Sequence, residues 1–465
     1  MILYTKAPQD NLFAVRHTLT EVLKMTAIGI DIGTTTVCAI AIDSGSGEVL
    51  HSITRPNPGV CDTIGIQKPD IIITECTEMT DELIAKFGNI SSIGISGQMH
   101  GIVYLDASGR SVSPLFTWQF PGANEEHPCG GTYAERLSRD SGYAMSTGFG
   151  LSTYYLHSLT GCVPTEASAC CTIHDYFALS LCKNSKPIIH ASDAASFGMF
   201  DFAKMDFDKA AVTASGMNAD ILPEVITNFE TIGHYRGIPV CVAGGDNQMS
   251  FIGSVCDIER CVLVNVGTGS QVSFASRRTD QIAGTELRPC CGDMMLRVGS
   301  ALCGGMAFAA LEKFIRGCAD LAGSDCKSAY ACIDEYLKSP EPPEPLRVST
   351  RFEGTRENPD ERGFIADISL NNFTPGHLIW GVIHSMADEL YRMYDRCGEE
   401  RSILVGSGNG LRKNPALQRT FESLFGLEMH TPQHKEEAAF GAALCGLYAC
   451  GEKKSLKEAQ ELIKY

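Results

Sequence analysis

Two short turns in the sequence have the residue types that bind phosphate. Gly33 is followed by Thr34 and Thr35 between two apolar runs, and Gly267 and Thr268 occupy the matching place in the second half of the chain. Glycine lets the backbone come close to a ligand, and successive N–H groups in a tight turn can surround an anion. One such turn is typical of an ordinary β-hairpin. Two matched turns favour a pair that holds a phosphate chain from both sides.

Two carboxylates near apolar strands are candidate metal ligands. Asp31 directly precedes the first turn, where a lone carboxylate would repel phosphate but would suit Mg²⁺, which takes few protein ligands and keeps phosphate oxygens. Asp246 follows two glycines after the apolar run 239–243, so we expect it to be exposed at a strand end. There it suits a general base that accepts a hydroxyl proton during phosphoryl transfer. The alternative for each is an aspartate that belongs only to its own turn.

A third group of side chains suits a polyol ligand. Amide and imidazole groups donate and accept hydrogen bonds, and the face of a tryptophan packs against the C–H surface of a sugar. Taken singly, each of these residues is more often structural than functional. The group comprises Gln98, Met99, His100, Trp118 and Gln119.

The apolar pattern predicts strands and helices in alternation around these residues. A hairpin at 27–43 is repeated at 261–274, with Asp31, Gly33 and Thr34 in the places of Asn265, Gly267 and Thr268. Residues 406–410 indicate a glycine-rich strand–helix turn, and 339–345 a surface loop. Further strands are expected at 90–95, 103–105, 239–243 and 402–405, and helices at 11–25, 132–140, 173–182, 375–396 and 436–448.

The chain is expected to form two α/β domains. Its 465 residues are too many for one compact core. The repeated hairpin argues that the two domains are related. We place an N-terminal extension at 1–26, one domain at 27–245 and the other at 246–465.

The composition excludes several classes of partner. The formal net charge of -17 repels nucleic-acid backbones, and no basic cluster offsets it. No run of 18 apolar residues is present, and residues 1–24 lack the apolar stretch of a secretion signal. The 20 cysteines contain no C-x-x-C spacing, which favours reduced, structural thiols. We therefore expect a cytoplasmic protein that binds neither nucleic acid nor a membrane.

The order of these motifs resembles the FGGY family of carbohydrate kinases. The resemblance extends from residue 27 to residue 451 and rests on five segments in sequence. These are Asp31-Ile32-Gly33-Thr34-Thr35, Ser96-Gly97-Gln98-Met99-His100-Gly101, Gly244-Gly245-Asp246-Asn247, Asn265-Val266-Gly267-Thr268-Gly269-Ser270 and Gly406-Ser407-Gly408-Asn409-Gly410.

The resemblance implies an actin-like, RNase H-like fold of two domains with a cleft for ATP and sugar between them. It implies Mg²⁺ and transfer of the γ-phosphoryl group to a sugar hydroxyl, with Asp246 as the base and Asp31 and Asp246 at the metal. The sugar contacts it implies are Asp246 and the polyol group defined above. The ATP contacts it implies are Gly33, Thr34, Thr35, Gly267, Thr268, Gly304, Gly305, Ser407, Gly408, Asn409 and Asn414.

Within the family, the Ser-Gly-Gln-Met-His-Gly segment is shared by xylulokinases and sedoheptulokinases, which implies a ketose substrate. The segments 117–119, 147–150 and 192–200 are more similar to sedoheptulokinases. Two positions depart from the family pattern. Phe120 stands where an aspartate is usual, which leaves the identity of the ketose open, and Cys303 stands where an asparagine is frequent.

The prediction is therefore ATP-dependent phosphorylation of a ketose of the sedoheptulose kind, with xylulose or another pentulose or polyol as the alternative. A non-catalytic, actin-like nucleotide switch would share the two turns, but it would not need the segment 96–101 or a tryptophan-lined pocket. A relative that only senses sugar would fit Phe120 and Cys303. The sequence leaves the phosphorylated hydroxyl and the oligomeric state open, with a homodimer as the candidate.

Overall fold

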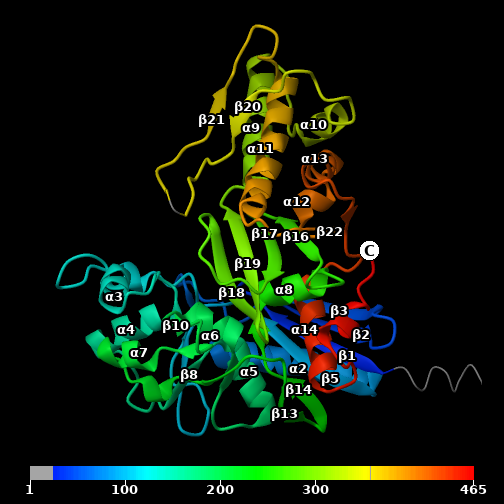
Figure 1. Cartoon of the computed structure of the whole chain (residues 1–465). Coiled ribbons are helices and arrows are strands. Elements are labelled where there is room, and N and C mark those ends of the chain that lie inside the picture. The colour runs from blue at the N-terminus through cyan, green and yellow to red at the C-terminus, as the bar shows by residue number, and fades with distance from the viewer. Residues whose placement is uncertain (1–24, 357) are drawn as a thin grey trace, which may run out of the picture. The chain divides into compact units, whose positions relative to one another are not determined.

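The computed structural model describes residues 25–356 and 358–465. Contacts divide the chain into two compact units (Figure 1). Unit 1 extends to Gly253 and also contains Glu436–Leu462, whereas unit 2 contains Ser254–Lys435 and Ile463–Tyr465. Residues 1–24 lie outside the described residues, and they contain nearly all of the predicted extension at 1–26 and of its helix at 11–25.

Unit 1 is built on a mixed sheet in the order β13-β14-β5-β1-β2-β3, with the short β15 also paired to β5. Strands β1, β2 and β3 form an antiparallel meander, whereas β5 and β14 run parallel to β1. The bounds are β1 Thr26–Ile32, β2 Thr36–Asp43, β3 Val49–Pro56, β5 Ile90–Gly97, β13 Thr231–Tyr235, β14 Ile238–Cys241 and β15 Gly244–Gly245.

Unit 2 is built on a second mixed sheet, in the order β18-β19-β17-β16-β22-β23. Here β16 pairs antiparallel with β17 and parallel with β22, as β1 does with β2 and β5. The bounds are β16 Cys261–Val266, β17 Ser270–Ser276, β18 Thr285–Cys291, β19 Met294–Ala301, β22 Ile403–Ser407 and β23 Met429–His430.

The predicted duplication extends to one polar pair in each sheet. Asp31 on β1 lies opposite Ser96 on the parallel strand β5, and the serine hydroxyl donates to Oδ1 of Asp31 at 2.9 Å. Asn265 on β16 lies opposite Ser407 on β22, and Nδ2 of Asn265 donates to the serine oxygen at 2.6 Å. The end of the first strand is therefore tied to its parallel neighbour in both units.

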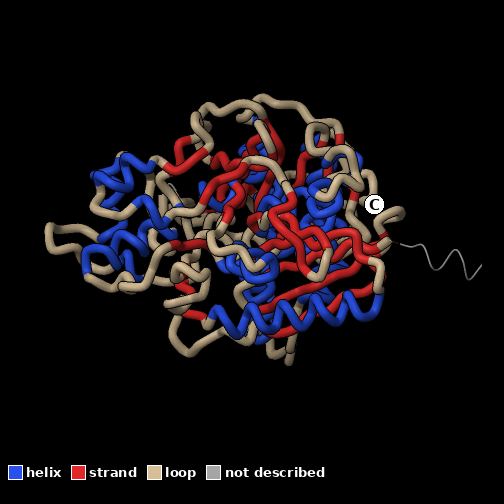
Figure 2. The backbone as a smooth tube through the Cα atoms, turned by 90° about the horizontal axis from the view of Figure 1, so that it is seen from below, coloured by secondary structure: helices blue, strands red, loops and turns tan. Residues whose placement is uncertain are grey.

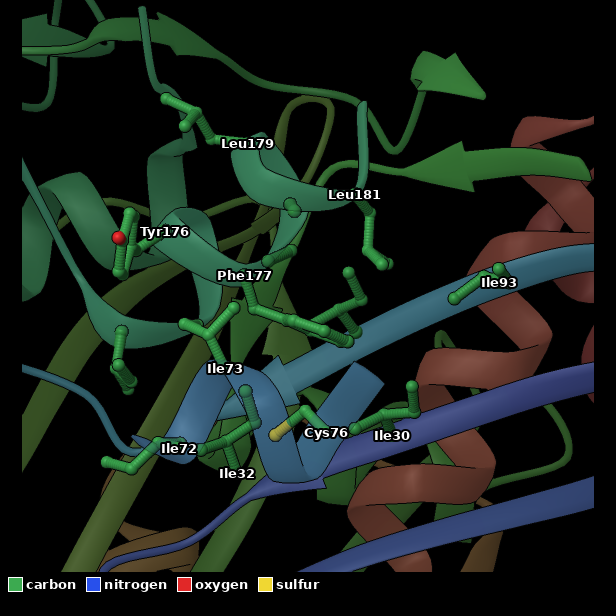
Figure 3. Close-up of a cluster of buried hydrophobic side chains, with 14 of the residues drawn as sticks. Ile30, Ile32, Ile72, Ile73, Cys76, Ile93, Tyr176, Phe177, Leu179 and Leu181 are labelled. Atoms are coloured by element: carbon green, nitrogen blue, oxygen red, sulfur yellow. The ribbon is translucent and has the colours of Figure 1, made fainter. Parts of the chain in front are cut away.

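One face of the unit 1 sheet is covered by α2 (Pro69–Phe87) and α5 (Ile173–Cys182). Alternate residues of β1 point to this face, because successive side chains of a strand point to opposite sides. Figure 3 shows Ile30 and Ile32 among side chains of both helices, including Cys76 and Phe177. This packing fixes the end of β1 from which the first phosphate-type turn departs.

The other face of the same sheet is covered by α14 (Glu437–Ala449), which packs against β1 and β5. Glycines make the approach possible: a Cβ at Gly29 would lie 1.9 Å from the carbonyl oxygen of Ala439, and one at Gly94 would lie 1.7 Å from that of Ala442. A Cβ at Gly441 of α14 would likewise lie 2.0 Å from the carbonyl oxygen of Met249, in α8 (Asp246–Ser254). The small residues of α14 therefore let this helix pack directly against the backbone of α8.

The two compact units differ from the domains expected at 27–245 and 246–465. The division falls after Gly253 rather than after residue 245, and the segment containing α14 belongs with the first unit. The reason is the close backbone packing of α14 on β1, β5 and α8, which sequence order does not reveal.

In unit 2, α11 (Pro375–Asp395) packs on β17 and β19 and alongside α9 (Gly305–Leu321). Val264, Phe274, Trp380 and Ile383 are buried in this core. Figure 2 shows the helices and strands of the whole chain in a view turned by 90° from that of Figure 1. The remaining elements are α10 Tyr330–Tyr336, α12 Asn409–Arg412, α13 Pro415–Phe425, β20 Arg347–Ser349 and β21 Phe364–Ala366.

The part of unit 1 between β5 and β13 forms small sheets and helices around an apolar core of its own. It carries the residues expected to bind sugar. Besides α5, its elements are β6 Val103–Leu105, β7 Leu115–Phe116, α3 Tyr133–Ser141, α4 Gly150–Thr160, β8 Ala169–Cys171, β9 Ile188–His190, α6 Ala191–Phe197, β10 Phe200–Asp201, β11 Asp206–Phe207, α7 Lys209–Ala214 and β12 Glu224–Ile226. Two short elements lie elsewhere in unit 1, β4 Ile66–Gln67 and α15 Leu456–Gln460.

Over residues 25–356 and 358–465, no helix has both the length and the apolar character needed to cross a bilayer.

We predict that Gly94→Ala destabilises unit 1, because the new Cβ would meet the backbone of α14 rather than a movable side chain. Overpacking of this kind costs about 1–3 kcal/mol. Thermal unfolding followed by circular dichroism should show a lower midpoint.

The control is Gly317→Ala within α9, where a Cβ would meet no atom within 4 Å. Alanine is the better helix former, so this variant should be at least as stable as the wild type. An unchanged midpoint for Gly94→Ala would contradict the close packing of α14.

Candidate active site

The first phosphate-type turn joins β1 to β2 and is held by buried amides. The Gly33 N–H donates to the carbonyl of Thr36 at 2.9 Å, which closes the turn. Nδ2 of Asn57 donates to the carbonyl of Gly33 at 2.9 Å, and Nε2 of Gln67 donates to that of Thr34 at 2.8 Å. With these carbonyls occupied, Thr34 and Thr35 remain accessible at the tip of the turn.

Two of the predicted sugar-binding residues are hydrogen-bonded to this turn. Nε1 of Trp118 donates to Oγ1 of Thr34 at 3.0 Å, and Oγ1 of Thr34 donates to Oε1 of Gln98 at 3.1 Å. Nε2 of Gln98 in turn donates to Oε1 of Gln67 at 2.9 Å. The polyol group and the first phosphate turn therefore form one hydrogen-bonded site.

His100 is fixed in orientation by its neighbours. Its ring stacks on Phe149 with centroids 4.8 Å apart and planes 6° apart, and Nδ1 lies 2.8 Å from the carbonyl oxygen of Ser196. A carbonyl only accepts, so Nδ1 carries the hydrogen, and the other ring nitrogen of a neutral imidazole is then an acceptor. The residue has a φ of 74°, a backbone strain of the kind that gathers at functional sites.

The other members of the polyol group lie at different depths. Trp118 is 48% exposed, and a Cβ at Gly148 would lie 2.0 Å from its carbonyl oxygen, so the segment 147–150 supports the tryptophan backbone. Gln119 is also exposed. Met99 is buried, and a Cβ at Gly245 would lie 2.8 Å from its side chain.

The two departures from the family pattern are both accommodated by packing. The ring of Phe120 lies against Phe116, with centroids 4.9 Å apart, and belongs to an aromatic cluster with His157. Cys303 is buried in the apolar core of unit 2. Phe120 therefore packs against the apolar core of its part of unit 1.

Asp246 begins helix α8 directly after the Gly244–Gly245 strand. It was expected to be exposed, but the structure leaves only part of it accessible. Burial, followed by the negative charge of Asp31, raises the pKa of Asp246 to about 7. The Asn247 N–H at the start of α8 acts in the opposite direction by donating a hydrogen bond. A carboxyl with this pKa can accept a proton near neutral pH.

A fully buried charge pair lies beneath the strands that lead to Asp246. Nε2 of His174 is 3.2 Å from Oδ1 of Asp193, an ion-pair distance, although the two atoms are not aligned as a hydrogen bond. Burial, the largest single effect, lowers the pKa of His174, but the carboxyl groups of Asp193, Asp175 and Asp246 together raise it to about 9. Both Asp193 and His174 act electrostatically on Asp246.

Glycines explain how this pair reaches the strands. A Cβ at Gly97 would lie 2.7 Å from Nδ1 of His174, and one at Gly245 would lie 2.9 Å from Oδ1 of Asp193. Gly97 and Gly245 are themselves partners in the β5–β15 pairing. The two glycines before Asp246 therefore make room for charged side chains.

The carboxylates of Asp31 and Asp246 suit a divalent cation. Burial raises the pKa of Asp31, and its charge raises that of Asp246, so each anion is unfavourable in this surrounding. A cation would relieve both effects. Within the described ranges no cluster of three or more candidate ligand side chains occurs.

Unit 2 contains a pocket of about 810 Å³ beside its own turn. The Gly304 and Gly305 N–H groups donate to the carbonyls of Thr268 and Gly267, at 3.0 and 2.8 Å, so the glycine pair fixes the turn. Asn414 caps α13 by accepting from the Leu417 N–H at 3.0 Å. The predicted residues that line the pocket are Gly267, Thr268, Gly305, Gly408, Asn409 and Asn414.

Two predicted residues lie behind this pocket instead of lining it: Ser407 is buried and bonded to Asn265, and Gly304 packs on the backbone of Gly269. The sequence analysis missed the aromatic wall of the pocket, formed by Phe308 and Tyr330.

In unit 1 the sequence analysis missed the buried polar residues Asn57, Gln67, His174 and Asp193. The signal that could have revealed one of them, His174, is the pair of polar residues His174 and Asp175 inside the apolar helix α5.

Two related α/β units, each with a phosphate-type turn between its first two strands, define an actin-like fold. Residues 26–253 match the N-terminal domain of the FGGY family of carbohydrate kinases, and residues 263–450 match the C-terminal domain. The chain belongs to this family and is accordingly a sugar kinase, a phosphotransferase.

The relatives include a sedoheptulokinase of Homo sapiens, 25% identical over 469 residues, with 90% of this chain and 96% of that protein covered. Among solved structures, a xyloylose kinase from Brucella ovis superposes with a TM-score of 0.79 at 19% identity, over 94% of this chain and 92% of that one. Plasmodium falciparum glycerol kinase with ADP gives 0.76 at 16% identity, over 95% and 93%. At these identities the likeness to the solved structures concerns the fold.

We predict that Asp193→Asn strongly destabilises the protein, because it leaves the buried His174 without its charged partner. Removal of one partner from a buried pair costs about 3–5 kcal/mol. Urea denaturation followed by intrinsic fluorescence measures the change. Asp140→Asn, which removes the accessible ion pair with Arg136, is the control and should change stability little. Equal effects of the two substitutions would contradict a buried charge pair.

Proposed function

We propose that this kinase transfers the γ-phosphoryl group of ATP to a hydroxyl of a ketose of the sedoheptulose kind. The observation that carries the proposal is the position of Asp246. It is a partly buried carboxylate at the start of α8, in the same unit as the Thr34 turn, Gln98 and Trp118. The sedoheptulokinase relative supports this kind of ketose.

In the proposed reaction, Asp246 accepts the proton of the attacking hydroxyl. Its pKa of about 7 suits this role, since a base works best when its pKa lies near the working pH. His174 and Asp193 remain beneath the strand ends and act electrostatically on Asp246. Most of the rate enhancement would come from positioning and charge stabilisation.

The sugar is held by the polyol group. His100 is proposed to contact the sugar, and the accessible ring of Trp118 would cover a C–H face. Gln98 faces the same turn through Thr34. Met99, which is buried, and Gln119, which is exposed, are the remaining proposed contacts of the sugar.

ATP is proposed to occupy the 810 Å³ pocket of unit 2, with the base near Phe308 and Tyr330 and the phosphates toward Gly267 and Thr268. Gly33, Thr34 and Thr35 would contact the terminal phosphate. Asp31 and Asp246 would hold Mg²⁺, which neutralises charge on the phosphates when it is bound.

Xylulose, another pentulose or a polyol is the alternative substrate. A non-catalytic nucleotide switch or a sugar sensor is the alternative of another class, and the aromatic packing of Phe120 weakens one reason for the sensor.

The last proposals concern the roles of the two units, the assembly and the cellular compartment. Unit 1, which contains 27–245, is proposed to bind the sugar, and unit 2, which contains most of 246–465, is proposed to bind ATP. A homodimer is the proposed assembly, and the cytoplasm is the proposed compartment, where reducing conditions would suit the 20 cysteine thiols.

We predict that Asp246→Asn abolishes ketose-dependent ADP release, because an amide cannot accept the proton, while ATP binding is kept. The substrate is found first by screening wild-type ADP release with sedoheptulose, xylulose, ribulose and related polyols. ATP binding is then measured by titration calorimetry. Near-normal turnover of Asp246→Asn would contradict its role as base, and ADP release that is indifferent to every sugar would favour the nucleotide switch.

The pH dependence should show the same carboxyl. The ionised form is the active base, so kcat/KM should rise with pH by about tenfold per unit below the pKa of this carboxyl and then level off; that pKa is about 7 without a cation and lower with one. The profile is measured between pH 5 and pH 9 at saturating ATP, an approximate range set by the pKa values of acidic side chains and histidine. A profile that is flat over this whole range would contradict the role of this carboxyl as the base.

A further inference from the structure

A closed ring of hydrogen bonds joins the first phosphate turn to the sugar-binding side chains. Oγ1 of Thr34 donates to Gln98, Nε2 of Gln98 donates to Gln67, and Nε2 of Gln67 donates back to the carbonyl of Thr34. Trp118 joins the ring through its bond to Oγ1 of Thr34. Gln98 is 3% exposed and Gln67 is 4% exposed, so water does not readily replace these bonds.

The direction of every bond in this ring is determined by one carbonyl. The carbonyl of Thr34 only accepts, so Gln67 must present its NH₂ group there and its oxygen to Gln98. Gln98 must then present its NH₂ group to Gln67 and its oxygen to Thr34. The Thr34 hydroxyl must therefore donate to Gln98, and its lone pair accepts from Trp118, whose indole is only a donor.

This direction has a consequence for phosphate binding. A hydroxyl has one hydrogen, and that of Thr34 is already used on Gln98. In this arrangement Oγ1 of Thr34, which also accepts from Trp118, has only a lone pair left, and a lone pair repels a phosphate oxygen. Thr34 can donate to phosphate only by giving up its bond to the oxygen of Gln98, and this loss is offset when another donor bonds that oxygen. A sugar hydroxyl is such a donor.

We propose that Gln67 is a positioning residue that keeps the Thr34 hydroxyl turned away from phosphate until a sugar hydroxyl donates to Gln98. The inference rests on the proposed function, because it concerns the same sugar and the same terminal phosphate. It explains how a sugar kinase avoids transferring phosphate to water in the absence of sugar. It also requires a substrate with a hydroxyl, not a hydrogen, at the position next to Gln98.

The turn itself does not depend on Gln67 alone. The side chain of Asn57 bonds the carbonyl of Gly33, and its N–H donates to the carbonyl of Thr35 at 2.8 Å. Removal of the Gln67 amide should therefore release the Thr34 hydroxyl without unfolding the turn. This separation makes the proposal testable by substitution.

The test is the rate of ATP hydrolysis without sugar in Gln67→Met, which keeps the length of the side chain and removes its hydrogen bonds. With Gln98 free to turn, the Thr34 hydroxyl can donate to phosphate at once. We expect the sugar-free hydrolysis to rise about three- to tenfold, the effect of one net hydrogen bond. The ratio of ketose-dependent to sugar-free ADP release should fall accordingly.

Gln460→Met is the matched control. Gln460 is equally buried in unit 1 and donates to the carbonyl of Ile252, away from the turn. It should lower the unfolding midpoint without raising sugar-free hydrolysis. If Gln67→Met gives the same result as this control, the residue is merely structural and the proposal is overturned.

A double-mutant cycle tests the mechanism itself. In a Thr34→Val background there is no hydroxyl to release, so Gln67→Met should add nothing to sugar-free hydrolysis. In a Thr34→Ser background the hydroxyl is kept and the rise should return. A rise that persists with Thr34→Val would contradict the inference.

The two proposals fail in different ways. Absence of ketose-dependent ADP release by the wild type defeats the proposed function. The hydrolysis comparison still decides the inference in that case, because it needs no sugar: a rise in Gln67→Met supports it, and an unchanged rate overturns it.

Discussion

The candidate site depends on the placement of buried charges beneath glycine backbone. His174 and Asp193 reach the ends of β5 and β15 because Gly97 and Gly245 have no side chains to exclude them. The same strand ends lead into Gln98 and Asp246, so the pair supports both a sugar contact and the candidate base. A buried charge pair is a costly feature, which is reasonable where position matters more than stability.

Close backbone packing extends this constraint to the rest of unit 1. Helix α14 lies directly on Gly29 and Gly94 and meets α8 through Gly441. A segment from the end of the chain thereby fixes the helix that begins with Asp246. Repetition of the same hairpin and parallel strand in unit 2 supplies the second turn, beside a pocket that the glycine pair Gly304–Gly305 helps to shape.

The sequence predicted much of this because local chemistry dictates it. Period-two apolar runs and glycine turns located the two hairpins, α5 matches its expected bounds, and the motif order indicated the family. The partial burial of Asp246 and the assignment of α14 to unit 1 depend on long-range packing. Gln67 and Asp193 lie far along the chain from the residues they serve, so only the fold reveals their bonds.

The central claim is that Asp246 receives the proton of the sugar hydroxyl that is phosphorylated. A crystal structure with the ketose and an unreactive ATP analogue tests it most directly. The account predicts the acceptor hydroxyl within about 2.6–3.2 Å of a carboxylate oxygen of Asp246, the reach of a general base. A sugar whose phosphorylated hydroxyl lies beyond that reach, with another side chain in contact, would contradict it.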